Sequence, residues 1–111
     1  MNIQIFGTAK SADTRKAQRY FKERNIRFQF IDMRQKGMSR GEFDSVLRAV
    51  GGVDIMLDID AKDTEAVSLI RYIYDKEDKL YENQQVIKLP VVRNGRQATV
   101  GYQPDVWKGW Q

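Results

Sequence analysis

The feature that most constrains the fold is a change of hydrophobic period near the start of the chain. Apolar residues alternate with polar ones over residues 3–6, recur at helical spacing from Asp13 to Asn25, and alternate again over residues 27–31. This pattern predicts a strand, a helix capped by Asp13 and closed near Asn25, and a second strand. Two strands joined by a helix within one sheet are expected to be parallel.

The middle of the chain predicts helices. Ser39 and Glu42 form a capping box at the start of a helix that Gly51 and Gly52 end. A second helical region follows Asp63, and the charged run over residues 75–79 is predicted to be a turn. The core-facing residues expected in that second region are Ala66, Leu69, Ile70 and Ile73.

The C-terminal part predicts a hairpin and a short helix. Asn94-Gly95 lies between two apolar segments and is a strong hairpin signal, so the last two strands are expected to be antiparallel. A closing helix over residues 105–110 would turn Val106 or Trp107, together with Trp110, toward the core. The predicted fold is α/β, with a mixed four-stranded sheet in a single domain over residues 1–111: β-α-β, a helical insertion, a β-hairpin and a C-terminal helix.

Composition excludes several kinds of chemistry. The 111 residues include no cysteine and no histidine, which excludes thiol redox couples, disulfides, Cys or His zinc sites and histidine-activated nucleophiles. The sequence shows no secretory signal and no apolar run near the roughly 18 residues of a membrane span, so we expect a cytoplasmic protein without a membrane partner. The net charge of +4 comes from mixed charges and permits anionic ligands without predicting a specific nucleic-acid partner.

Three segments together point to a known family. They are the loop over residues 7–14 followed by Arg15-Lys16-Ala17, the segment Pro90-Val91-Val92, and Val100-Gly101-Tyr102 before a tryptophan-containing helix. In this order they resemble the arsenate reductase (ArsC) family, including its Spx-like branch. The resemblance runs from Ile3 to about Trp110 and implies a thioredoxin-like fold of the ArsC type.

The resemblance also assigns roles to positions in this chain. The family's nucleophilic cysteine falls on Ser11, and the second cysteine of Spx-like members falls on Thr14. The arginine that precedes the proline in arsenate reductases is Leu89 here, with Lys88 one step further back, and the third anion-binding arginine falls near Tyr102. The proline itself, Pro90, is expected to follow a cis peptide bond and to face the active-site loop.

The candidate site therefore centres on Ser11, the position of the catalytic cysteine. Backbone amides at the start of a helix bind anions, so we expect anion binding beside Arg15 and Lys88 by the amides of Ala12, Asp13 and Thr14. Lys10 and Pro90 are expected to support the loop. The alternative is that the Asp13 carboxylate caps the helix and competes with an external anion.

Other interpretations of these residues are weaker. Lys10-Ser11 between a strand and a helix is similar to the end of a phosphate-binding P-loop, but the glycine spacing of that loop is absent. Four acidic residues lack the glycine and distal glutamate of a calcium loop, so no metal site is predicted; they are Asp54, Asp58, Asp60 and Asp63. A basic stripe on the first helix is interpreted as a solvated face; it consists of Arg15, Arg19 and Lys22.

The resemblance implies a protein of a thiol-dependent oxidoreductase lineage that is inactive as written, because serine replaces the nucleophile at position 11. No bound cofactor is expected, and glutathione, thioredoxin or glutaredoxin would serve as reductant, and a small oxyanion as substrate, only for a cysteine form. The alternative is a non-enzymatic, Spx-like regulator that binds the RNA polymerase α subunit through Arg48 and Gly51-Gly52. A fold that persists without either activity is a third interpretation.

Overall fold

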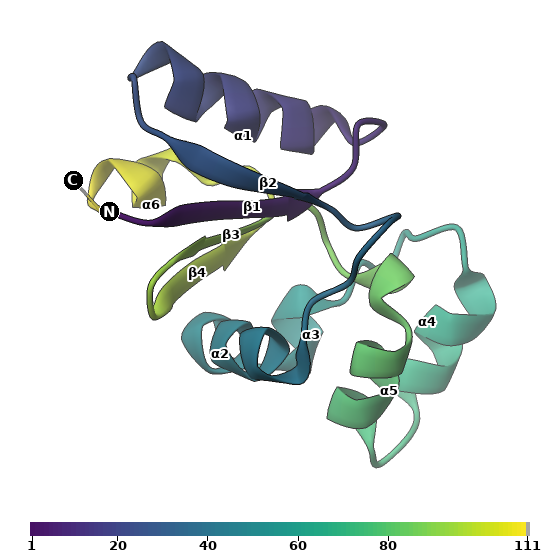
Figure 1. The fold of residues 1–111 in the computed structure, drawn as a ribbon. Coiled ribbons are helices and arrows are strands. Elements are labelled where there is room, and N and C mark those ends of the chain that lie inside the picture. The colour runs from purple at the N-terminus through teal and green to yellow at the C-terminus, as the bar shows by residue number, and fades with distance from the viewer. Residues whose placement is uncertain (111) are drawn as a thin grey trace.

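A mixed four-stranded sheet forms the centre of the computed structural model, which describes residues 1–110 (Figure 1). The strand order is β2-β1-β3-β4. β1 pairs in parallel with β2, whereas the β1–β3 and β3–β4 pairs are antiparallel, which confirms the predicted mixed sheet. The strands are β1 (Ile3–Gly7), β2 (Phe28–Asp32), β3 (Val91–Asn94) and β4 (Gln97–Val100).

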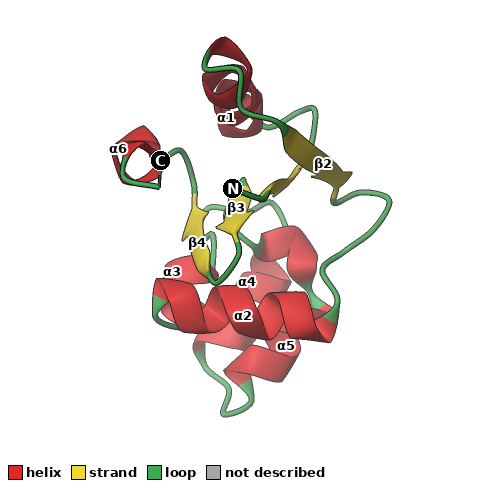
Figure 2. Cartoon of the chain, turned by 60° about the vertical axis from the view of Figure 1, so that its left-hand side comes forward, coloured by secondary structure: helices red, strands yellow, loops and turns green. Residues whose placement is uncertain are grey.

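Helices cover both faces of this sheet (Figure 2). One face carries α1 (Ala12–Glu23) and α6 (Pro104–Lys108). The insertion between β2 and β3 covers the other face and extends past the end of the sheet where β1 stops (Figure 1). It consists of α2 (Arg40–Val50), α3 (Val53–Met56), α4 (Thr64–Arg71), α5 (Lys76–Glu82) and the 3-10 turn η1 (Gln84–Val86).

The sheet separates two hydrophobic cores. Because side chains alternate along a strand, Ile3 and Ile5 of β1 face α1 and α6, whereas Phe6 faces the insertion. The α1–α6 core is rich in aromatic residues and includes Tyr20 and Phe21 beside the tryptophan of α6. The insertion core is mostly aliphatic, with Phe43 fully buried at its centre.

The helix ends of α2 agree with the sequence analysis. Ser39 Oγ accepts a hydrogen bond from the Glu42 amide at 3.2 Å, and the Ser39 amide donates to Glu42 Oε1 at 2.8 Å, so the predicted capping box is present. Gly51 ends the helix with a left-handed φ of 101°. A residue with a side chain would be strained in that conformation, which explains why glycine stands there.

Three local predictions were wrong, and one short helix was not predicted. Ser11, not Asp13, caps α1, because the Ser11 hydroxyl accepts from the Thr14 amide. Residues 75–79 lie mostly in the helix α5 and not in a turn. Leu69 is 45% exposed and does not belong to the core. The short helix α3 gave no clear signal in the sequence.

The C-terminal segment follows the prediction closely. β3 and β4 form the expected hairpin, with Gly95 in a left-handed conformation directly after the last paired residue of β3. The Leu89–Pro90 peptide bond is cis, as expected from the resemblance. Of the candidates for the closing helix, Trp107 is buried, Val106 is 45% exposed and Trp110 is half-buried. No helix within residues 1–110 is long and apolar enough to span a bilayer.

Candidate functional site

Ser11 lies at the end of the loop between β1 and α1, directly before the first residue of the helix. It has an extended backbone conformation, and its Oγ accepts a hydrogen bond from the Thr14 amide at 3.1 Å. This bond is the typical interaction of an N-cap serine and stabilises the first turn of the helix. The candidate nucleophile position is thus occupied by a hydroxyl that already serves as a helix cap.

Several backbone groups of this loop, and the Arg15 guanidinium, already form hydrogen bonds within it. The Ser11 amide donates to the Thr8 carbonyl at 3.2 Å, and the Arg15 amide donates to the Ser11 carbonyl at the same distance. The Arg15 guanidinium folds back and donates to the Ala9 carbonyl at 2.6 Å. Of the three amides predicted to bind an anion, the Thr14 amide is bound to Ser11, so those of Ala12 and Asp13 remain for an external ligand.

A hollow of about 740 Å³ brings several predicted site residues together. Ser11, Ala12 and Asp13 line one side of it, and Lys88 and Leu89 approach from the segment before β3. Pro90, which follows Leu89, is buried, and Lys10 is exposed on the loop; neither lines the hollow. The structure therefore places Ser11 and Lys88 on one cavity, although their roles as ligands stay predictions.

The third wall of this hollow is acidic. It comes from the loop between α3 and α4, including Asp58, Asp60, Lys62 and Asp63. With Asp13, the lining of the hollow carries four carboxylates. It carries two lysine ammonium groups, those of Lys62 on the same wall and of Lys88 on the opposite side. Like charge repels an oxyanion, so this wall opposes the binding of arsenate or phosphate at Ser11.

Two backbone hydrogen bonds hold the acidic loop in this position. The Asp58 amide donates to the Val86 carbonyl at 2.8 Å, and the Lys88 amide donates to the Met56 carbonyl at 2.7 Å. They tie the segment after α3 to the segment before β3, although the two are far apart in the sequence. Sequence analysis found these carboxylates but not their position opposite Ser11, because only the tertiary pairing of the two segments shows it.

Two of the acidic side chains have structural roles. Asp58 Oδ1 accepts from the Asp60 amide at 3.0 Å and shapes the loop. Asp63 caps α4: its Oδ1 accepts from the Ala66 amide at 3.1 Å, and its Oδ2 accepts from the Gln85 side chain at 3.0 Å. Within the residues that the structure describes, no group of three or more acidic side chains is arranged to hold a metal ion.

The bond from Gln85, followed by that from the Ala66 amide, holds the pKa of Asp63 below its ordinary value of 3.8. A carboxyl with a lowered pKa in the folded state adds stability that is present above its unfolded pKa and is lost as the pH falls through the folded pKa. We therefore expect Asp63→Asn to be less stable than the original chain at neutral pH and to lose less stability below about pH 4. Urea unfolding midpoints measured across this range test the expectation. Asp105→Asn, at an exposed carboxylate, is the control for the change in net charge. If this variant lost as little stability at acid pH as Asp63→Asn, the role of Asp63 would be contradicted.

Thr14 packs against the end of β1. Its side chain is fully buried, and its Oγ1 has no hydrogen-bond partner among the described residues. Gly7 lies so close that a Cβ built on it would approach Thr14 Cγ2 to 2.5 Å. The absence of a side chain at Gly7 is what allows α1 to start directly against the strand.

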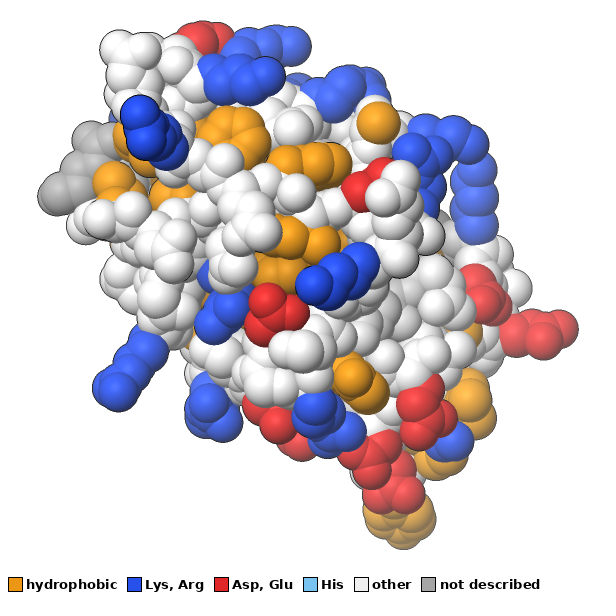
Figure 3. Space-filling model, viewed as in Figure 1, with side chains coloured by type: hydrophobic (Ala, Val, Ile, Leu, Met, Phe, Trp, Pro, Cys, Tyr) orange, Lys and Arg blue, Asp and Glu red, His pale blue; other side chains and the backbone are white. Residues whose placement is uncertain are grey.

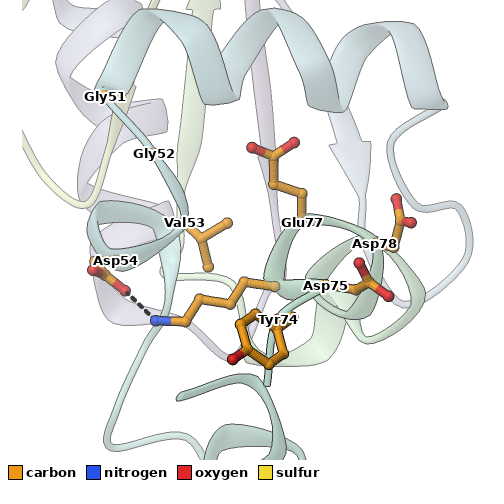
Figure 4. Close-up of a pocket in the computed structure, with 9 residues that line it drawn as sticks. Gly51, Gly52, Val53, Asp54, Tyr74, Asp75, Glu77 and Asp78 are labelled. Carbon is orange, nitrogen blue, oxygen red and sulfur yellow. Dashed lines mark ion pairs between the residues drawn. The ribbon is translucent and has the colours of Figure 1, made fainter. Parts of the chain in front are cut away.

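A second hollow, of about 480 Å³, lies between the end of α2 and the start of α5 (Figure 4). Gly51 and Gly52 form one side, and Tyr74, Asp75 and Glu77 lie on the other. The exposed Arg48 lies one helical turn before Gly51. This is the region that the Spx-like resemblance indicated for partner contacts.

No protein-family model and no curated protein sequence matches the chain. Solved structures do match. A putative ArsC family related protein from Bacteroides fragilis has a TM-score of 0.82 at 19% identity, with 100% of this chain and 98% of that chain covered. An arsenate reductase from Vibrio cholerae has a TM-score of 0.80 at 20% identity, over 96% of this chain and 94% of that one. The chain has an ArsC-type thioredoxin fold.

The wider thioredoxin-like class is also represented among the matches. The glutaredoxin-like protein NrdH-redoxin from Escherichia coli has a TM-score of 0.52 at 17% identity, over 100% of this chain and 96% of that chain. The higher scores of the ArsC-type structures confirm the predicted subtype of the fold.

Within this ArsC-type fold, the positions that the resemblance assigns to arginines hold other residues. Leu89 lines the hollow beside Ser11, but its side chain cannot donate a hydrogen bond. Tyr102 is 40% exposed and packs edge-on against Trp107. Lys16 lies 5.8 Å above the Tyr102 ring and within 4.0 Å of Asp13, so this cation is already engaged.

Proposed function

We propose that this chain belongs to the thiol-dependent oxidoreductase lineage of ArsC-type proteins and that, with serine at position 11, it does not catalyse thiol chemistry itself. The observation that carries the proposal is the position of Ser11. Ser11 lies at the N-terminus of α1 and lines the 740 Å³ hollow. The resemblance assigns the nucleophile to this position, but the Ser11 hydroxyl caps the helix.

The chemistry of serine supports inactivity. A thiol at a helix N-terminus can ionise at neutral pH, because the helix and nearby cations lower its pKa from about 8.5 to between about 3.5 and 7.5. A serine hydroxyl needs a base to remove its proton, and the chain has no histidine. Among the described residues, no Lys or Arg side chain hydrogen-bonds to Ser11. Glutathione, thioredoxin or glutaredoxin is accordingly proposed as reductant only for a cysteine form.

We further propose that arsenate would be a poor substrate even for such a form. Leu89 and Tyr102 replace two of the arginines that the resemblance assigns to anion binding. The carboxylates of Asp58, Asp60 and Asp63 face the same hollow as Ser11. Both features weaken the binding of an oxyanion, whereas neither prevents thiol–disulfide exchange.

Ser11→Cys tests this proposal. We expect the introduced thiol to have a pKa at least about one unit below the ordinary 8.5, because it lies at the N-terminus of a twelve-residue helix. It should form a mixed disulfide with glutathione and be reduced by glutaredoxin or thioredoxin. The measurements are the pH dependence of thiolate absorbance and the rate of reaction with a disulfide reagent.

Ser68→Cys is the matched control, since Ser68 is an exposed serine within α4 and away from any helix start. Asp60→Asn combined with Ser11→Cys should lower the thiol pKa further, because one carboxylate is removed from the facing wall. A thiol at position 11 that ionises and reacts like the one at position 68 would refute the proposal.

A second candidate function, a non-enzymatic protein-binding module, is favoured by the hollow between α2 and α5. The Gly51-Gly52 turn and the fully exposed Tyr74 border this hollow, and the exposed Arg48 lies close to it in the sequence. As part of this candidate we propose a cytoplasmic protein that binds the RNA polymerase α subunit. Binding of the purified α subunit that Arg48→Glu abolishes would support it, and absent or unchanged binding would reject that partner.

A further inference from the structure

Charge is strongly segregated between residues 54–82, which hold α4, α5 and most of α3, and the rest of the chain. Residues 54–82 carry nine carboxylates and four cations, a net charge of −5. The remainder carries fifteen cations and six carboxylates, a net charge of +9. Figure 3 shows this division on one face of the molecule, with Lys and Arg gathered over α1 and acidic side chains over α4 and α5.

Exposed apolar side chains gather in the same acidic segment. Of the eight large hydrophobic residues that are exposed within residues 1–110, five fall between positions 55 and 74. Tyr74 is fully exposed, Tyr72 is 80% exposed and Ile55 is 49% exposed. Ile55 directly follows Asp54 and Tyr72 lies two residues before Tyr74, so both flank residues that line the hollow between α2 and α5. Exposed apolar side chains beside a hollow are typical of surfaces that bind another molecule.

The hollow beside Tyr74 is lined by four carboxylates and by one cation, Lys76 (Figure 4). Asp54 is paired with Lys76 at 3.8 Å, and Asp78 with Arg40 at 2.7 Å. No ion pair within the described part of the chain reaches Asp75 or Glu77, the other two carboxylates of the lining.

Two further features add to the negative potential of the hollow. Gly51 and Gly52 bring the C-terminal end of α2 to its edge, and the carbonyl groups at a helix C-terminus favour cations. The exposed Tyr74 ring offers a face on which a guanidinium group can lie. The hollow thus combines unpaired carboxylates, a helix C-terminus and an aromatic ring.

We infer that the insertion face, formed by Ile55, Tyr72, Tyr74, Asp75 and Glu77, docks a basic segment of another protein. An arginine of that segment enters the hollow between Tyr74 and the two unpaired carboxylates, and neighbouring apolar side chains cover Ile55 and Tyr72. The inference rests on the second candidate function and specifies the chemistry of its partner, without depending on the α subunit being that partner.

Charge complementarity and shape favour this occupant over two others. A small free cation would fill the hollow but leave Ile55 and Tyr72 uncovered. A second copy of this chain would offer the basic side of α1, where Tyr102 is an exposed apolar side chain beside Lys16, whereas the acidic segment exposes five large apolar side chains. A basic segment with interspersed apolar residues matches both parts of the surface.

The experiment uses the full chain and three capped peptides of equal length: arginine alternating with leucine, arginine alternating with serine, and glutamate alternating with leucine. Binding is followed by fluorescence anisotropy of labelled peptides at low and high salt. We expect the arginine–leucine peptide to bind most tightly and the glutamate–leucine peptide not to bind. Salt should weaken the binding, because charge pairs contribute to it.

Variants locate the binding on the insertion face. Tyr74→Ala should weaken the arginine–leucine peptide roughly three-fold, from the loss of an exposed cation–π contact. Glu77→Lys should weaken the binding of this peptide about ten-fold, because a carboxylate that attracts the peptide's arginines is replaced by a positive charge that repels them. Tyr102→Ala and Glu23→Lys repeat these changes at exposed positions on the other side of the sheet and should leave the affinity unchanged.

Several outcomes would overturn the inference. They are no binding of the arginine–leucine peptide, equal binding of both arginine peptides, or equal weakening by Glu23→Lys and Glu77→Lys. Self-association in sedimentation that Glu77→Lys abolishes, without peptide binding, would identify a second copy as the occupant and overturn it too. Peptide binding without α-subunit binding would reject only the α subunit as partner, and reactivity of Ser11→Cys tests the lineage separately.

Discussion

Trp107→Ala is expected to lower the free energy of unfolding by about 3–5 kcal/mol. Trp107 is only 1% exposed and packs against the rings of Tyr20, Phe21 and Tyr102. Its indole Nε1 also donates a hydrogen bond to Thr99 Oγ1 at 2.9 Å, so the substitution leaves a cavity and an unpaired hydroxyl. A domain of this size is typically stable by about 5–15 kcal/mol, so the loss would be a large part of the total.

Chemical denaturation followed by far-ultraviolet circular dichroism measures this effect. Trp110→Ala is the matched control, because the same side chain is removed from a half-buried position on the edge of the same core. Its cost should be clearly smaller. Similar costs for the two variants would contradict the role given to Trp107 as the centre of the α1–α6 core.

Gly7→Ala is expected to destabilise the fold by about 1–3 kcal/mol, because a Cβ at this position overlaps the Thr14 side chain. The contact joins the end of β1 to the first turn of α1, so the strain falls on the loop that holds Ser11. Thr14→Ala alone should cost little, since the buried Thr14 Oγ1 has no hydrogen-bond partner to lose. Urea denaturation of the single and double variants measures these changes.

The double variant Gly7→Ala/Thr14→Ala should regain at least about half of the stability lost in Gly7→Ala, which is the coupling expected of side chains in direct contact. Gly41→Ala provides the contrast, because nothing lies within 4 Å of a Cβ built at that helical position. That change should raise stability by about 0.5–1 kcal/mol. Additive effects of Gly7→Ala and Thr14→Ala would show that the two positions do not contact each other.

The sequence predicted the sheet well because its signals there are local. A strand, a helix and a strand in the first third of the chain require a parallel pair, and Asn94-Gly95 requires an antiparallel one. The capping box at Ser39 and the end of α2 at Gly51 depend on interactions within a few residues. Such features are present in the sequence whatever the rest of the chain does.

The insertion was harder to predict because tertiary contacts decide its details. In α4, Val67 and Leu69 lie on opposite sides of the line through Ala66 and Ile70, so two apolar stripes fit helical spacing equally well. The fold buries Val67 and exposes Leu69. The helix α5 has Leu80 as its one fully buried residue, so its sequence carries almost no periodic signal.

In the candidate site, too, features set by local sequence were predicted and features set by tertiary contacts were not. Motif order indicated Ser11 and Lys88, and the structure places both on one hollow. The cap was misassigned because Asp13 and Ser11 are both good N-cap residues two positions apart, and only the backbone conformation selects Ser11. The acidic wall opposite Ser11 depends on the pairing of residues 56–58 with 86–88, which no local pattern encodes.

The separation of the two cores has a consequence for spectroscopy. Trp107 and Trp110, the only tryptophans of the chain, both lie on the α1–α6 side of the sheet. Intrinsic tryptophan emission therefore reports on that side alone, and local opening of α4 and α5 would pass unseen. An emission curve that coincides with the circular dichroism curve would show that the insertion melts together with the sheet, whereas a difference between them would identify the insertion as a separate cooperative unit.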